Sequence, residues 1–206
     1  MNNYKGTRVP KQNRSIKTKR KIMEAAKKLF SDKGYYNTNS KEISDMAEVS
    51  IGSFYSYFKD KRELFLEIVI DIGKEIKRFM EHELNDKALH KNKSNAREVI
   101  YKQVKKVFDA HNISPKFHRE VSIMKYFDPD VRKIKEEEEE KEIKIILNLL
   151  TKFKNITRVK DLESAAELIF YSIENVTHAT KFHEIKIDEE RIINEFTDML
   201  IRYLLD

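Results

Sequence analysis

The sequence contains no cysteine, and its 206 residues include only four glycines and three prolines. Without cysteine, the chain can form neither disulfides nor thiolate metal sites, and it has no cysteine nucleophile. No stretch approaches the roughly 18 apolar residues that a membrane helix needs, and no apolar signal segment follows the N-terminus. The sequence therefore predicts a cytoplasmic protein without membrane contact.

Several signatures of catalysis are missing as well. The chain has no Gly-rich phosphate loop and no H-E-x-x-H pair. Residues 136–140 form a run of five glutamates, but consecutive helical residues point around the whole helix and cannot converge on one ion. Lysines four residues away from these glutamates predict i,i+4 ion pairs on a solvated face instead. We expect no enzyme activity, no cofactor and no metal site.

Charge is distributed unevenly along the chain. Residues 1–62 contain 15 Lys and Arg against 6 Asp and Glu, whereas the remaining residues contain 26 against 29. A positive segment followed by a slightly negative one suggests that the first part faces a polyanion. Residues 1–15, with Lys5, Arg8, Lys11 and Arg14, are expected to form a flexible basic arm.

Apolar residues recur at intervals of three and four, which indicates helices throughout and no strand of consequence. A first helix carries Ile22 to Phe30 and ends at Gly34, where glycine suits the position after a helix. Short helices follow over 40–47 and 51–58, the second capped by Ser50, and Asp60 caps a long fourth helix. Further helices are expected at about 95–110, 115–126, 128–154, 160–182 and 188–205.

The two short helices have the spacing of a helix-turn-helix, whose second helix enters the DNA major groove. Val49 and Phe54 would lock the helices together from inside. Gly52, Ser53, Tyr55 and Tyr57 are then expected on the outer face, where small residues allow close approach and tyrosine can meet a phosphate or a thymine methyl. Lys61 adds charge at the start of the fourth helix, where backbone N–H groups favour an anion.

Residues 20–65, "RKIMEAAKKLFSDKGYYNTNSKEISDMAEVSIGSFYSYFKDKRELF", resemble the DNA-binding domain of the TetR family of transcriptional regulators. The resemblance implies phosphate contacts from Thr38, Tyr55 and Lys61. It implies base or phosphate contacts from Ser50, Gly52, Ser53 and Tyr57.

The chain departs from the family pattern at two positions. Glu48 stands where the family usually has a turn glycine, so it either holds a strained turn at a cost of about 1 kcal/mol or adopts a different turn. Tyr57 replaces the family's commonest histidine.

The family also implies the architecture. The chain should be all-α, with an N-terminal three-helix DNA-binding domain joined by a long helix to a larger helical domain for ligand binding and dimerisation. The expected division is 1–15 for the arm, 16–62 for the helix-turn-helix domain and 63–206 for the effector domain, with 63–84 as the linking helix. Expected partners are a double-stranded DNA operator, a small-molecule effector and a second copy of the chain.

Two residue sets are candidates within the larger domain. Apolar stripes on its last two helices would form a dimer interface, or would simply fill the core of one chain; the dimer candidates are Ile169, Ile173, Phe196, Leu200 and Tyr203. The effector pocket is expected to be lined by Tyr101, Phe108, Phe117, Met124, Phe127 and Phe170, with Glu174 or His178 as polar contacts. A buried Glu174 would favour a cationic ligand.

The leading interpretation is a ligand-responsive dimeric repressor that leaves a palindromic operator when it binds a small molecule. The alternatives are an activator or an architectural protein that binds DNA without sequence preference.

Overall fold

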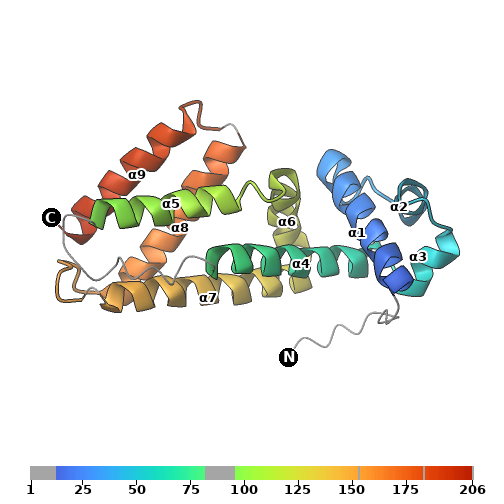
Figure 1. Ribbon diagram of the computed structural model, residues 1–206, viewed down its shortest axis with the longest axis horizontal. Helices are drawn as coiled ribbons and strands as arrows, with labels where there is room; N and C mark the ends of the chain where they lie inside the picture. Colours follow the sequence, from blue (N-terminus) through green and yellow to red (C-terminus); the bar gives the residue numbers. More distant parts are fainter. Residues whose placement is uncertain (1–12, 82–95, 153, 183, 206) are drawn as a thin grey trace. The chain divides into compact units, whose positions relative to one another are not determined.

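The computed structural model describes residues 13–81, 96–152, 154–182 and 184–205 (Figure 1). Within these ranges the chain is all-helical and has no strand, as the sequence predicts. Its helices are α1 (Asn13–Lys33), α2 (Ser40–Met46), α3 (Ile51–Tyr57), α4 (Lys61–Glu81), α5 (Ala96–Ala110), α6 (Pro115–Phe127), α7 (Pro129–Lys152), α8 (Leu162–Lys181) and α9 (Glu189–Leu204). None of the helices so described is long and apolar enough to cross a membrane.

Local sequence signals set the helix ends. Asn39 caps α2 and forms a reciprocal capping box with Glu42, and Ser50 caps α3 by accepting the N–H of Ser53. Gly34 follows α1 with φ +87°, a conformation that glycine adopts at little cost. The five helices expected beyond residue 95 lie within two residues of their predicted bounds. Residues 13–15 belong to α1 and not to the expected arm, whose other residues lie outside the described ranges.

The chain divides into two compact units. The first comprises Met1–Lys74 and Lys116–Ile134, and the second comprises Glu75–Pro115 and Lys135–Asp206. This division differs from the expected boundary at residue 62, because α6 and the first residues of α7 belong with the N-terminal helices. The difference is one of tertiary packing, which the helix periodicity alone does not report.

Aromatic rings from three helices form the centre of the first unit. The ring of Phe65 on α4 lies 5.3 Å from Phe30 of α1 and 5.3 Å from Phe117 of α6, measured between centroids. All three side chains are fully buried. The N–H of Tyr35 also donates to Glu120 of α6 over 2.6 Å. These contacts attach α6 to the loop after α1 and to α4.

An ion pair adds a second connection inside the first unit. The guanidinium of Arg62, in the first turn of α4, donates to both carboxylate oxygens of Asp128 over 2.6 and 2.8 Å and to Asp130 over 2.6 Å. Asp128 also accepts the N–H groups of Asp130 and Val131 at the start of α7. One nearly buried carboxylate therefore caps α7 and binds α4.

The second unit has its core between α5, α8 and α9 (Figure 1). One cluster of its buried side chains comprises Val104, Phe108, Ile173, Ile193, Phe196 and Leu200, with Ile169 packed against them. A second cluster comprises Leu150, Ala165, Ala166 and Leu204. Ile173, Phe196 and Leu200 therefore fill the core of one chain, and their predicted role in a dimer interface was wrong. Tyr203 remains 39% exposed.

Candidate nucleic-acid interface

The turn between α2 and α3 shows how Glu48 is accommodated. Its φ is +55°, so Glu48 adopts the left-handed conformation, which agrees with the alternative of a strained turn. The N–H of Glu48 donates to Asp45 O over 3.1 Å, and the N–H of Val49 donates to Ser44 O over 3.0 Å. Glu48 therefore places a side chain in a backbone region that favours glycine.

Replacing Glu48 by glycine is expected to raise the free energy of unfolding by about 0.5–1 kcal/mol, because the left-handed conformation then carries no side-chain clash. The Lys21–Glu48 ion pair that is lost is exposed, with 3.8 Å between its nitrogen and oxygen, and contributes little. Urea denaturation measures the change. Glu48→Ala is the control, since alanine keeps the strain and should give no gain; an equal gain from alanine would contradict the explanation.

Helix α3 presents the expected outward face at its N-terminal part. Ser50 and Gly52 are exposed, Ser53 is half-buried and Tyr55 is 52% exposed, whereas Phe54 is fully buried. A β-carbon built on Gly52 would meet only Ser50 Oγ, at 4.0 Å. The backbone at Gly52 is therefore open to close approach by another molecule.

Tyr57 does not lie on that outer face. Its side chain is only 5% exposed, and its hydroxyl lies 3.0 Å from the hydroxyl of Ser15 at the start of α1. The prediction that Tyr57 faces outward was wrong, because the last turn of α3 packs against α1. Tyr57 thus holds the last turn of α3 against α1.

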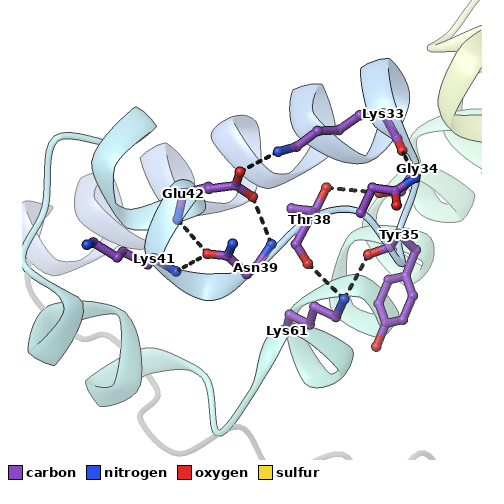
Figure 2. A network of polar contacts seen from close by, with 9 residues as sticks. Lys33, Gly34, Tyr35, Thr38, Asn39, Lys41, Glu42 and Lys61 are labelled. Atoms are coloured by element: carbon purple, nitrogen blue, oxygen red, sulfur yellow. Dashed lines mark hydrogen bonds and ion pairs between the residues drawn. The ribbon is translucent and has the colours of Figure 1, made fainter.

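Lys61 and Thr38 belong to one polar network (Figure 2). The ammonium of Lys61 donates to the carbonyl oxygens of Tyr35 and Thr38, each over 2.8 Å, and lies 4.3 Å from the centroid of the Tyr35 ring. Thr38 is buried, and its hydroxyl donates to Gly34 O. Burial lowers the pKa of Lys61, against the charge of Glu42. In this structure the network holds the loop between α1 and α2 against the start of α4.

The start of α4 is occupied by the chain's own carboxylates. Asp60 accepts the N–H of Glu63 over 2.8 Å, and Glu63 accepts the N–H of Lys59. The cap at Asp60 is as predicted. It also places two negative charges where the sequence suggested a phosphate site, which weakens the case for an anion there.

Positive side chains surround α1 and the helix-turn-helix. The exposed lysines and arginines up to α4 are Arg14, Lys17, Arg20, Lys21, Lys28, Lys41 and Lys59. Such charges attract a phosphate backbone and orient a protein on it without selecting its sequence.

The expected effector residues are divided between the two units. Phe117 and Met124 are buried in the first unit, and Phe127 is 67% exposed there beside Tyr36. Phe117, Met124 and Phe127 thus belong to a different unit from Phe170, and their place in an effector pocket stays a prediction. The other expected residues, Tyr101, Phe108, Phe170, Glu174 and His178, lie in the second unit.

Glu174 and His178 lie together with a residue that the sequence analysis missed, His111 after α5. Burial acts to raise the pKa of Glu174, but His111 outweighs it and lowers that pKa to about 2. The sequence signal was limited to the i,i+4 spacing of Glu174 and His178. The third member lies more than 60 residues away, so no local pattern could assign it.

Comparison with known proteins relates the N-terminal part of this chain to a family of bacterial transcriptional regulators. The sequence profile described as "Bacterial regulatory proteins, tetR family" matches residues 22–68. Over 63 residues the chain is 43% identical to the uncharacterized HTH-type transcriptional regulator YhgD of Bacillus subtilis, covering 31% of this chain and 33% of that protein. Two further curated relatives are matched over 21% and 16% of their length. The chain thus matches a third or less of these relatives.

Two known proteins are similar to this chain over most of its length. The fatty acid metabolism regulator protein of Bacillus subtilis is 24% identical over 87% of this chain and 92% of its own length. A transcriptional regulator from Saccharomonospora viridis, solved in complex with choline, has a TM-score of 0.77 with 16% identity, over 93% of this chain and 99% of that one. The second likeness shows the fold. The profile match assigns residues 22–68, which contain the helix-turn-helix, to the tetR family of bacterial regulatory proteins.

Proposed function

We propose that this protein is a transcriptional regulator that reads a palindromic DNA operator with α3 and is released from it by a small molecule. The observation that carries the proposal is the exposed N-terminal face of α3, with Ser50, Gly52 and Tyr55 outward and Phe54 and Tyr57 anchored inside. A rigid helix with small outward residues suits base contacts in the major groove. The proteins that it resembles are named as regulators, which supports a non-enzymatic role at the level of the family.

We propose that the two units have different functions. Residues 16–62 would read DNA, and the second unit would bind the effector and a second copy of the chain. Exposed apolar side chains remain on α8 and α9, namely Leu168, Tyr171, Met199 and Tyr203. We propose these as dimer contacts in place of the buried residues first expected, since a dimer sets two recognition helices about 34 Å or a multiple apart on DNA.

Release by an effector would use the contacts that attach α6 and α7 to the DNA-reading helices. Glu120 of α6 binds the loop before α2, and Asp128 binds the first turn of α4. A molecule that moved α6 or α7 would displace the contacts made by Glu120 and Asp128. Such a molecule can shift the equilibrium only by the difference between its affinities for the DNA-bound and released states.

Selection of bound sites from a randomised DNA library, at near-physiological salt, tests the proposal. The expected result is enrichment of a palindrome that the protein prefers over unrelated DNA by about a thousandfold or more. Binding that weakens with rising salt but enriches no sequence would instead favour an architectural role. Reporter transcription from the enriched site then distinguishes repression from activation.

A further inference from the structure

Three side chains in the second unit bring nitrogen and oxygen atoms close together. Glu174 and His178 lie one turn apart on α8, and His111 follows the end of α5. Glu174 Oε2 lies 3.5 Å from His111 Nε2 and 3.9 Å from His178 Nε2. One ligand atom from each residue lies within 4.8 Å of the other two. Two histidine nitrogens and a carboxylate oxygen are typical ligands of zinc and related ions.

A hydrogen bond orients the most buried of the three residues. His111 Nδ1 lies 2.9 Å from the carbonyl oxygen of Val107, so Nδ1 carries a proton and donates it. Nε2, the atom that faces Glu174, is then the ring nitrogen that would bind an ion after losing its proton. Metal-binding histidines are commonly held in this way, with the other ring nitrogen bonded to a backbone carbonyl.

Charges from α7 add to the case for a cation. Lys135, Glu138 and Glu142 interact electrostatically with the cluster, and Lys135 pairs with Glu138 over 2.8 Å. With neutral histidines, three carboxylates including Glu174 oppose one ammonium, which leaves an excess of two negative charges. A divalent ion bound by neutral histidines would offset this excess of negative charge.

The distances also favour a bare ion over an organic cation. Zinc lies about 2.0–2.1 Å from nitrogen and oxygen ligands, so two ligand atoms of a tetrahedral site are roughly 3.3 Å apart. The separations of 3.5 and 3.9 Å need only small side-chain movements to reach this value. A quaternary ammonium group is larger and is recognised by the faces of aromatic rings.

We propose that His111, Glu174 and His178 form a binding site for one divalent transition-metal ion such as Zn²⁺. The fourth coordination position would be taken by water or by Glu142. This inference goes beyond DNA reading and does not depend on it, because the site can be tested without DNA.

Titration of the purified, EDTA-treated chain with Zn²⁺ and with Co²⁺ tests the site. One equivalent is expected to bind with a dissociation constant in the roughly micromolar range or tighter, and Co²⁺ should show the visible absorption of a four-coordinate nitrogen and oxygen site. Glu174→Gln and His178→Ala should each weaken binding about a hundredfold or more. Circular dichroism checks that both variants are folded.

Two control variants test whether metal binding depends on the proposed site and not on other charged or histidine residues. Glu167→Gln changes an exposed glutamate on the same helix and should bind metal as the parent does. A chain with His82, His90 and His183 replaced by glutamine should also bind one equivalent. Unchanged affinity in folded Glu174→Gln and His178→Ala, loss of binding in the triple variant, or binding of choline but not of Zn²⁺ would each overturn the proposal.

Discussion

Replacing Gly52 by alanine is expected to lower operator affinity about ten- to a hundredfold while leaving the fold intact. Gly52 lies in the first turn of α3 on the face proposed to meet DNA, and a β-carbon there meets only Ser50 Oγ, at 4.0 Å. The methyl group therefore costs the free protein nothing and should raise its free energy of unfolding by about 0.5 kcal/mol, since alanine favours helix over glycine. Against DNA it occupies the space that a base edge or phosphate needs, at about 1–3 kcal/mol.

Fluorescence anisotropy with the selected operator measures the affinity, and thermal denaturation measures the stability. Ser31→Ala is a suitable control, because Ser31 is a neutral residue of α1 whose hydroxyl bonds only to Lys27 O among the contacts described. That variant should bind the operator as the parent does. If Gly52→Ala binds normally, the N-terminal part of α3 does not approach DNA closely, and the reading face must be placed elsewhere.

Replacing Arg62 by alanine is expected to lower the free energy of unfolding by about 2 kcal/mol. The substitution removes three hydrogen bonds and leaves the carboxylate of Asp128, whose side chain is 9% exposed, without its counter-ion. The loss is smaller than for a fully buried pair because Arg62 stays partly in water and Asp128 keeps its bonds to the start of α7.

The stability lost in Arg62→Ala should depend on pH and should become smaller in acid. Burial acts to raise the pKa of Asp128, but its bonds to Arg62 outweigh this and hold the pKa below its ordinary value. A depressed carboxyl pKa stabilises the folded state above the ordinary value, near 3.9, and the contribution fades as pH falls through the folded value. The difference between parent and Arg62→Ala should therefore be full at neutral pH and shrink below about pH 4.

Urea denaturation at several pH values measures both effects. Lys133→Ala, which removes a cation from an exposed site on α7, should change the stability little. Combining Arg62→Ala with Asp128→Asn should cost less than the sum of the single changes, because the double variant has no uncompensated charge. Additive losses would mean that Arg62 stabilises the protein by some route other than Asp128.

The same ion pair bears on regulation. Arg62 is the second residue of α4, directly after the helix-turn-helix, and its partners belong to the junction of α6 and α7. An effector signal carried by α6 or α7 would reach the DNA-reading helices through this pair and through Glu120. In Arg62→Ala, operator binding should persist where the protein is folded, while release by an effector should weaken. Equal release in both proteins would exclude the ion pair from the proposed route.

The helices and the exposed N-terminal face of α3 could be predicted from the sequence. Helix bounds follow from the 3.6-residue period and from caps such as Ser50 and Asp60, which accept an N–H three residues further along the chain. The helix period also predicted the outward placement of Gly52 and Tyr55, but it placed Tyr57 outward as well, where the structure buries it. At Glu48 the sequence left a strained turn and a different turn as alternatives, and the positive φ favours the first.

Which neighbour covers each helix face depends on tertiary packing. A stripe such as Ile173, Phe196 and Leu200 shows that a face is apolar, but the same stripe can pack inside one chain or between two. The helix period predicts Tyr57 on the surface, because nothing in the sequence of α3 indicates that Ser15 lies beside it. The pairs Arg62–Asp128 and His111–Glu174 join residues more than 60 positions apart. Such contacts depend on how helices pack, and helix periodicity carries no information on the partner.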